Sequence, residues 1–282
     1  MNKTLLTVAS AIAVTLSACN SNKMEQNPFL ADYTTQYGIP PFDQIKYEHY
    51  LPAVEKGIAE QNAEIEAIIA NPATPDFENT ILALDNSGQL LNKVAYVFFA
   101  LSESDNTPEM QELNPKISSL LTAHSDNMGM NADLFNRIHD VYNRRDSLGL
   151  NTAQLRLLDN YYKDFVRSGA LLDEEKKAGL KVVNQQLSDA FIAFNENVLN
   201  GTNNWELVVE NEAELSGLPE GTIATAAEEA KARGKEGKWV FTLHAPSRLA
   251  VLTYANNRDL REKIWKGYTS LATDSAYCNY DN

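Results

Sequence analysis

The sequence predicts a mainly α-helical protein with one small two-stranded β element, and three observations lead to this fold class. Apolar residues recur every three or four positions over most of the 282-residue chain, which is the period of a helix with one buried face. Short alternating runs typical of strands occur at 205–209 and 239–243. Residues that favour helix starts, such as Thr, Asn and Pro, precede most of the periodic segments.

Three helices are predicted in the first part of the chain. Residues 43–70 have a helical period, which ends at Asn71-Pro72. Thr74-Pro75-Asp76 is expected to cap a second helix, which carries apolar residues from Phe77 to Phe98. A third helix is expected to begin at Thr107-Pro108-Glu109, because a proline at the first helical position loses no hydrogen bond.

Two shorter helices are predicted next. Met130-Asn131 opens the fourth helix, which ends near Arg144-Arg145, where positive charge suits a helix C-terminus. Asn151-Thr152-Ala153-Gln154 has the spacing of a capping box and opens the fifth helix.

The clearest helical pattern runs from Asp173 to Leu199. Its apolar residues form one continuous stripe, and the helix would be about 40 Å long. We expect this stripe to pack against neighbouring helices, so that replacing Phe191 by alanine would cost about 3–5 kcal/mol if its side chain is fully buried. The stripe consists of Leu180, Val183, Leu187, Phe191, Phe194 and Val198.

After this helix, the spacing of apolar residues changes from a helical period to short alternating runs. The two alternating runs at 205–209 and 239–243 are predicted to be strands. Between them, a helix is expected to begin after Leu218-Pro219-Glu220 and to run to about Arg233. Two final helices are predicted near 247–254 and from Asn257 onward.

Residues 1–18 have the pattern of a lipoprotein signal peptide. Lys3 supplies a positive charge, and the apolar stretch that follows is too short to span a bilayer. Leu16-Ser17-Ala18-Cys19 ends in small residues before a cysteine, which predicts cleavage before Cys19 and a diacylglycerol on its thiol. An ordinary secretory peptide with an incidental Cys19 is the alternative. The protein is therefore expected to be exported and anchored by lipid to a bacterial membrane, on its periplasmic or surface face.

The remaining organisation follows from that assignment. Residues 19–26 would form a lipidated tether, and residues 27–282 the incomplete N-terminal helical region of a larger protein. The chain has 24 basic and 38 acidic residues and a net charge of −14, which argues against a nucleic-acid partner. With Cys19 lipidated, the second cysteine, Cys278, cannot form an internal disulfide and is expected to be a small packed residue.

The sequence contains no constellation that predicts catalysis or metal binding. None of the four histidines belongs to a His-Glu-x-x-His motif, which would place two imidazoles one helical turn apart. Such scattered histidines are expected to cap helices or to be half-buried, with ligands meeting from distant segments as the alternative. We therefore predict no catalytic and no metal-binding residue in this chain. The histidines are His49, His124, His139 and His244.

Two other groups of residues are given a structural interpretation. The acidic pairs Glu174-Glu175 and Glu228-Glu229 are interpreted as solvated charge, because adjacent helical residues point in different directions. Tyr161 and Tyr162 with Phe165 could line a ligand groove, but this spacing is more typical of a core stripe.

Several segments, taken in order, resemble the thimet oligopeptidase family of zinc peptidases. Asn27-Pro28-Phe29-Leu30, then residues 40–45 and 48–53, are similar to the opening of bacterial peptidyl-dipeptidases and oligopeptidases. The first of these segments and Ser87-Gly88 favour the peptidyl-dipeptidase (dipeptidyl carboxypeptidase) branch. The further similar segments are 77–84, 144–150, 165–170, 214–219, 252–254 and 260–263.

This resemblance implies the N-terminal part of a helical, channel-containing zinc metallopeptidase that acts as a monomer and releases dipeptides from the C-termini of short peptides. In the family, the zinc-binding motif lies beyond the equivalent of Asn282. The chain as given is therefore expected to bind no zinc, to be inactive, and to form part of one wall of the channel. Two alternatives remain open: a non-enzymatic helical lipoprotein that binds peptides or a protein partner, and, within the family, an endopeptidase of the oligopeptidase branch.

Overall fold

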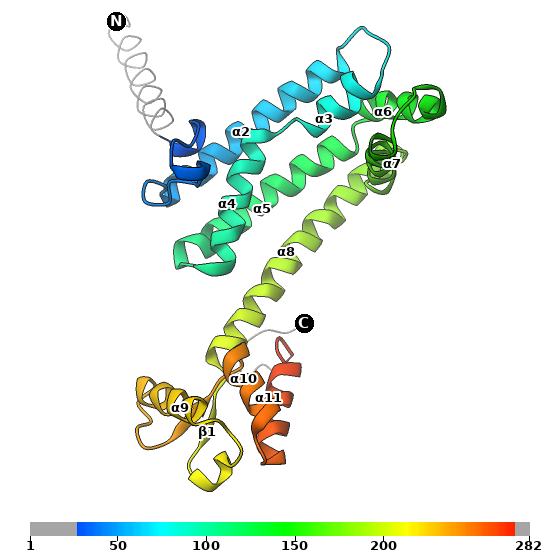
Figure 1. Cartoon of the computed structure of the whole chain (residues 1–282). Coiled ribbons are helices and arrows are strands. Elements are labelled where there is room, and N and C mark those ends of the chain that lie inside the picture. The colour runs from blue at the N-terminus through cyan, green and yellow to red at the C-terminus, as the bar shows by residue number, and fades with distance from the viewer. Residues whose placement is uncertain (1–26, 274–282) are drawn as a thin grey trace, which may run out of the picture. The chain divides into compact units, whose positions relative to one another are not determined.

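A computed structural model describes residues 27–273, and the fold is mainly α-helical with one two-stranded antiparallel sheet, as predicted (Figure 1). These residues form two compact units, which meet in sequence between Ser188 and Asp189. Cys19, the rest of the predicted signal peptide and tether, and Cys278 lie outside the described residues. Within the described part, no helix has the length and apolarity needed to cross a membrane.

The first unit is all-helical, and most of its helices begin where the sequence predicts them. Thr107 caps α5 through its side-chain oxygen, and Asn151 forms a capping box with Gln154 at the start of α7. Its elements are α2 (Tyr47–Ile69), α3 (Ala83–Asp85), α4 (Gln89–Ser104), α5 (Pro108–Gly129), α6 (Ala132–Arg144), α7 (Thr152–Arg167) and the beginning of α8 (Glu174–Asn204), with 3-10 turns at Pro28–Leu30, Gln36–Gly38 and Arg145–Ser147.

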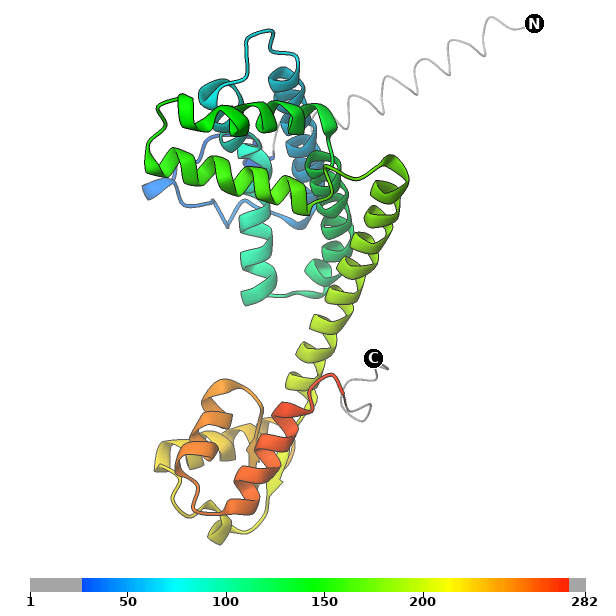
Figure 2. The ribbon, with the colours of Figure 1, turned by 90° about the vertical axis from the view of Figure 1, so that its right-hand side faces the viewer.

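Two apolar clusters form the core of this unit. One joins α2, α4 and α5 with the first 3-10 turn, and Phe29, Phe98 and Ile117 are completely buried in it. The other is centred on α6 and α7, which lie side by side (Figure 2), and it buries Ile138 and Leu158. Burial of these side chains is the main source of stability for the unit.

The prediction of a single second helix is wrong. A π-helical turn (Phe77–Leu82), the short α3 and then α4 replace it, with a break at 86–88. Gly88, the N-cap residue of α4, has a left-handed backbone with φ 70°, which interrupts the helical path, and its N–H donates to Glu64 Oε2 at 2.7 Å. The break has a physical reason: the apolar residues before it pack in the α6–α7 cluster, whereas those after it pack in the α2–α4–α5 cluster.

A glycine allows α2 and α4 to approach each other closely. A Cβ atom at Gly57 of α2 would lie 2.8 Å from both the backbone N and the Cα of Leu91 in α4. Since backbone atoms cannot rotate away as a side chain can, this crossing requires a residue without a side chain.

The N-terminal segment is fastened to the first unit by side chains. Asn27 Nδ2 donates a hydrogen bond of 2.8 Å to the carbonyl oxygen of His49. Lys93 Nζ donates to the carbonyl oxygens of Phe29 (3.0 Å) and Ala31 (2.6 Å) and lies 3.9 Å from the ring centroid of Tyr33. We call these four contacts the N-terminal clamp.

The described part of the second unit combines a two-stranded antiparallel sheet with the end of α8 and three further α-helices. The predicted strands are confirmed, as β1 (Leu207–Val209) and β2 (Trp239–Phe241), which pair antiparallel with Leu207 opposite Phe241. Its helices are the end of α8, α9 (Glu220–Ala232), α10 (Ala245–Tyr254) and α11 (Arg258–Thr269), with a 3-10 turn at Glu212–Leu215. Trp205 covers Gly267 of α11, where a Cβ would lie 2.5 Å from the indole.

The helix predicted at 173–199 is confirmed as α8, but the expectation that its apolar stripe is buried is wrong. Four of its side chains are exposed by about half: Val183 by 55%, Leu187 by 53%, Phe191 by 59% and Phe194 by 44%. Polar side chains of α8 form hydrogen bonds with α5 instead: Asn184 Nδ2 donates to Asp126 Oδ1 (2.7 Å), and Lys181 Nζ donates to Asn127 Oδ1 (2.8 Å).

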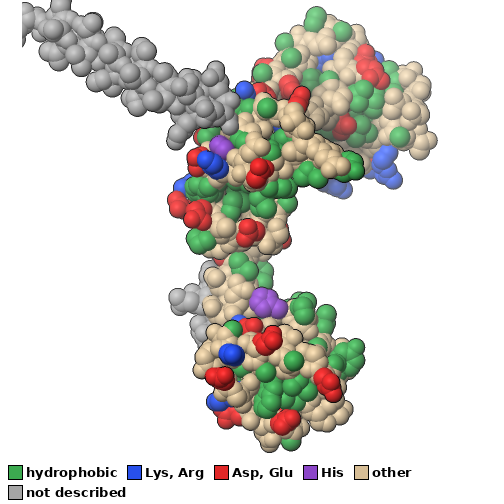
Figure 3. All heavy atoms as spheres, turned by 60° about the vertical axis from the view of Figure 1, so that its left-hand side comes forward, with side chains coloured by type: hydrophobic (Ala, Val, Ile, Leu, Met, Phe, Trp, Pro, Cys, Tyr) green, Lys and Arg blue, Asp and Glu red, His purple; other side chains and the backbone are tan. Residues whose placement is uncertain are grey.

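The distribution of charged side chains on the surface agrees with the excess of acidic over basic residues in the sequence. On the face shown in Figure 3, acidic side chains are scattered over the described residues, and basic side chains lie among them without gathering into a patch. A nucleic acid requires a continuous basic surface, so this face does not favour such a partner.

Candidate functional site

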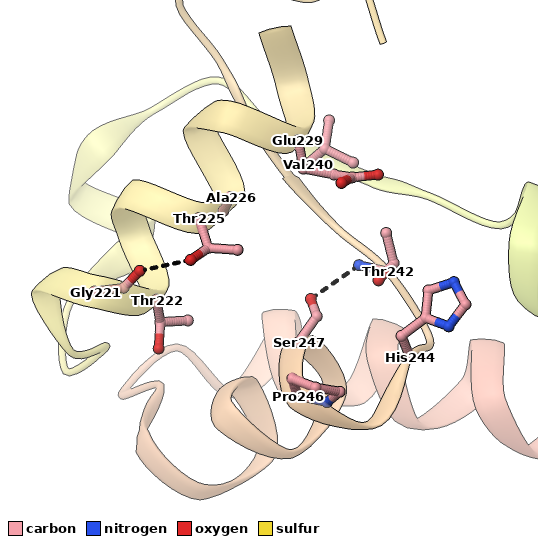
Figure 4. A pocket seen from close by; sticks show the side chains of 10 residues that line it. All are labelled: Gly221, Thr222, Thr225, Ala226, Glu229, Val240, Thr242, His244, Pro246 and Ser247. Carbon is pink, nitrogen blue, oxygen red and sulfur yellow. Dashed lines mark hydrogen bonds between the residues drawn. The ribbon is translucent and has the colours of Figure 1, made fainter. Parts of the chain in front are cut away.

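The second unit contains a pocket of about 350 Å³ between α9, β2 and the beginning of α10 (Figure 4). Residues of α9 one helical turn apart form one wall, and alternate residues from β2 onward form another. The lining residues are Gly221, Thr222, Thr225, Ala226, Glu229, Val240, Thr242, His244, Pro246 and Ser247.

Local sequence explains the shape of the pocket. Small residues of α9, such as Gly221 and Ala226, leave room beside the strand. Val240, Thr242 and His244 are two residues apart and therefore share one face of the chain as it leaves β2. Pro246 then fixes the first turn of α10, since proline suits the first helical positions.

The polar groups of the pocket are partly engaged with the protein itself. The backbone N–H of Thr242, a residue that is only 5% exposed, donates to Ser247 Oγ at 3.0 Å. Thr225 Oγ1 donates to the carbonyl oxygen of Gly221 at 3.0 Å. Glu229 accepts a charge-assisted hydrogen bond of 2.7 Å from Arg233 Nε.

This arrangement suits binding better than catalysis. A nucleophilic serine requires a base within hydrogen-bond reach, whereas Ser247 Oγ accepts a backbone N–H. The Glu229 carboxylate is already engaged by Arg233 at 2.7 Å. The hydroxyl groups of the threonines and the serine could hold a polar ligand.

The histidines predicted to be structural are found in separate environments. His49 Nδ1 accepts the backbone N–H of Lys46 at 3.0 Å, so this histidine caps α2, as expected. His124 is buried in α5, and its Nε2 lies 2.7 Å from Gln61 Oε1. Burial lowers the pKa of both imidazoles.

The other two histidines belong to different units. His139 of α6 stacks on Phe135, with ring centroids 5.7 Å apart, and His244 lines the pocket. Within residues 27–273, no group of three or more His, Cys, Asp or Glu side chains is placed to hold a metal ion.

The aromatic residues of α7 belong to the core, which confirms their interpretation as a core stripe. Phe165 is buried, and Tyr161 and Tyr162 pack against the same cluster. Tyr161 Oη donates to Asp85 Oδ1 at 3.0 Å, and burial, together with this carboxylate, raises the pKa of the phenol.

The prediction of solvated charge is confirmed for three of these four glutamates and is wrong for Glu229, which is half-buried and lines the pocket. Glu174 and Glu175 are exposed in the first turn of α8, where negative charge is favourable. Glu228 is exposed, and Glu229 forms the ion pair with Arg233.

Sequence reasoning missed the pocket. The available signals were the alternation of Val240, Thr242 and His244 and the spacing of Thr222 and Thr225. The same patterns occur on ordinary solvated surfaces, because spacing shows which side chains share a face and not what lies opposite them.

Comparison with known proteins finds similarity to several peptidases. The chain is 39% identical over 251 residues to dipeptidyl carboxypeptidase of Escherichia coli (strain K12), covering 89% of this chain and 37% of that protein. It is 34% identical over 248 residues to oligopeptidase A of Salmonella typhimurium, covering 88% of this chain and 36% of that protein. A thimet-like oligopeptidase of Dictyostelium discoideum is 22% identical over 191 residues, or 67% of this chain and 28% of that protein.

No protein-family model matches the chain. By the coverages of 37% and 36% given above, the chain spans a little over a third of the length of the bacterial relatives that it matches.

Proposed function

Because this chain belongs to the thimet oligopeptidase family, together with dipeptidyl carboxypeptidase and oligopeptidase A, we propose that it is part of a zinc-dependent peptidyl-dipeptidase that removes dipeptides from the C-termini of short peptides. The observation that carries this proposal is the 39% identity to dipeptidyl carboxypeptidase over 89% of the chain. The 34% identity to oligopeptidase A makes an endopeptidase the second candidate.

The described residues, 27–273, do not fit a zinc site. A hydrolytic zinc ion needs three protein ligands and a water molecule. His49 uses its Nδ1 to cap α2, His124 pairs with Gln61, and no suitable cluster exists among the described residues. We propose that the zinc ligands belong to polypeptide outside the aligned region and that this chain supplies part of the peptide-binding wall.

A peptidase assay tests this proposal. The purified chain should not cleave a blocked peptide in a chelator-sensitive way. A longer protein, in which the chain is joined to the rest of E. coli dipeptidyl carboxypeptidase, should release dipeptides from a free C-terminus, and a chelator should stop the release. Amidation of the peptide C-terminus should reduce this cleavage, because an exopeptidase recognises the terminal carboxylate. Equal cleavage of the amidated peptide at internal bonds would favour the endopeptidase.

We further propose that the protein is exported and anchored through a lipid on Cys19. The support is the position of Leu16-Ser17-Ala18-Cys19 at the end of the apolar stretch. Growth with a palmitate analogue should label the protein, and Cys19→Ala should abolish the label. Cys278→Ala is the matched control and should remain labelled. Equal labelling of Cys19→Ala and the unmodified chain would contradict the anchor.

A non-enzymatic peptide-binding lipoprotein is the candidate from a different class, and the pocket beside Thr242 and Ser247 favours it. If this is the function, the purified chain alone should bind short peptides, and Thr242→Val should weaken binding. Isothermal titration with an uncleaved peptide distinguishes this function from that of a peptidase part that needs further polypeptide.

A further inference from the structure

A loop of the first unit, at 37–42, holds three large apolar side chains in contact with solvent. Tyr37 is 89% exposed, Phe42 is 51% exposed and Ile39 is 50% exposed. All three lie within six residues, between the start of the 3-10 turn Gln36–Gly38 and the beginning of α2. Single exposed apolar side chains are common on protein surfaces, whereas several together mark a place where another apolar surface binds.

The backbone of the loop holds these side chains outward. The N–H of Gly38 donates to the carbonyl oxygen of Thr35 at 3.1 Å, which closes the 3-10 turn. The N–H of Phe42 donates to the carbonyl oxygen of Pro40 at 2.8 Å. Tyr37 has a left-handed backbone with φ 63° and ψ 15°, which is unfavourable for a residue with a side chain. Because the Tyr37 ring is almost fully exposed, packing inside the unit offsets little of this cost.

The composition of the loop suits a lipid surface. Residues 33–42 carry no charge, although 22% of the residues of the chain are charged. The loop combines a tyrosine, which favours the headgroup region, with isoleucine and phenylalanine, which enter the boundary of the acyl chains. Its flanking residues Asp32 and Asp43 are exposed, and the net charge of the chain is −14. Anionic lipid repels such a surface, so a zwitterionic bilayer is the better match.

The predicted lipid site lies close to this loop along the chain. Asn27 follows Cys19 by eight residues, a stretch that can span at most about 29 Å. Asn27 is itself fixed to α2 by its hydrogen bond of 2.8 Å to the carbonyl oxygen of His49, and the loop directly precedes α2, in the blue part of Figure 1. A lipid on Cys19 would therefore hold the loop near the bilayer and give the contact a high effective concentration.

We propose that the 37–42 loop is a membrane-contact site, which places Tyr37, Ile39 and Phe42 among the headgroups and upper acyl chains of a zwitterionic bilayer. This proposal rests on the proposed anchor at Cys19. Two points of attachment fix which side of the first unit faces the membrane, whereas one point does not. A second copy of this chain is the competing occupant of the loop.

Fluorescence at the loop tests the proposal. The form that begins at position 19, without the predicted signal peptide, carries Cys19→Ser and Cys278→Ala and an N-terminal hexahistidine tag. The tag holds it on phosphatidylcholine vesicles that contain a nickel-chelating lipid. A polarity-sensitive dye on Ile39→Cys should shift its emission to shorter wavelength on the vesicles and shift back when imidazole releases the chain. The same dye on Tyr96→Cys, a position of α4 that is 75% exposed, is the matched control and should keep its emission.

Unchanged emission at position 39 would overturn the proposal, and so would an equal shift at position 96, because the chain would then adsorb without a specific contact. A shift that needs no vesicles and grows with protein concentration would assign the loop to a second copy, which also overturns it. Since the tag replaces the lipid, this result is independent of acylation in cells. A shift at position 39 together with an unlabelled Cys19 in cells would support the contact and count against the anchor alone.

Partition of a singly acylated chain provides a second measurement. One myristoyl chain binds a bilayer with a constant of about 10⁴ M⁻¹, so a further contact is readily detected. Coupled to Cys19 in a Cys278→Ala background, this acyl chain should bind phosphatidylcholine vesicles at least about tenfold more weakly when Ile39→Ser and Phe42→Ser are combined, because the exposed halves of both side chains then add no burial.

The partition measurement has two controls. Tyr96→Ser should leave the partition constant unchanged. The double variant should keep the Tm of the unmodified chain in the absence of vesicles, since half-exposed side chains contribute little to folding. Equal partition of the double variant and the unmodified chain would overturn the contact.

Discussion

The need for a glycine at position 57 follows from the distances to its neighbours. A methyl group there would come within 2.8 Å of the backbone of Leu91, so α2 and α4 would have to separate. We expect Gly57→Ala to lower the free energy of unfolding of the first unit by about 1–3 kcal/mol, as overpacking does in other cores. Urea denaturation measures this loss.

Gly179 provides the matched control for this substitution. It also lies inside a helix, α8, but a Cβ there would have no neighbour within 4 Å. Gly179→Ala should therefore be neutral or stabilise by up to about 1 kcal/mol, because alanine loses less entropy in a helix. Equal losses at the two positions would show that the α2–α4 contact is looser than described.

His124 makes stability depend on pH. Gln61 Nε2 donates to Ser87 Oγ, so Gln61 Oε1 is left to accept the Nε2–H of His124, and burial lowers the pKa of the imidazole. The unfolded chain, where the pKa is about 6.5, then binds a proton before the folded chain does. Stability is therefore full above about pH 6.5 and decreases as the pH falls toward the folded pKa.

The variant His124→Gln should show a smaller decrease. Glutamine can still donate to Gln61 but does not titrate, so the free energy of unfolding should change less between about pH 7 and pH 5. Chemical denaturation at several pH values measures this slope. Identical slopes for the variant and the unmodified chain would contradict a role for His124.

The sequence could predict the structural role of His49 but not that of His124. His49 bonds to Lys46, three residues earlier, and local spacing reveals such a cap. The partner of His124 is Gln61, 63 residues away, and no local pattern records a contact of that range.

At the scale of elements, α8 provides the clearest difference between pattern and packing. Its period correctly predicts a helix with an apolar side, since the period is a property of the helix alone. Whether that side is covered depends on other segments, which periodicity does not contain. The same limit explains the second helix, where an unbroken apolar pattern conceals the break at Gly88 between two clusters.

Two phenylalanines test the correction for α8. Phe98 of α4 is completely buried, and Phe98→Ala should cost about 3–5 kcal/mol. Phe191 is 59% exposed, so Phe191→Ala should cost less than about 1 kcal/mol in the chain alone. Thermal and urea unfolding of the two variants measure both values. Similar losses for both would restore the buried stripe that the sequence predicts.

At the scale of the whole molecule, the apolar clusters divide between the two units. The two clusters of the first unit and the cluster around Trp205 share no buried residue. Two-state unfolding is expected of a single cooperative core, whereas separate cores can unfold separately. Calorimetry should therefore give an enthalpy larger than the van't Hoff value, with two transitions.

Gly267→Ala assigns these transitions. The added methyl group would press on Trp205, which belongs to the core of the second unit. One transition should shift downward, by about 4–8 °C for each kcal/mol lost in a unit of this size, and the other should remain in place. A shift of both transitions together would mean that the described residues unfold as one cooperative unit.

The N-terminal clamp has a mechanical consequence for a protein held at its N-terminus. Any force applied there enters the fold at Asn27 and acts on the hydrogen bond to His49 of α2 and on the two bonds donated by Lys93 of α4. The load would thus be shared at once between α2 and α4, which the close contact at Gly57 holds together. In a single-molecule pulling experiment, Lys93→Met should lower the force at which the first unit begins to unravel.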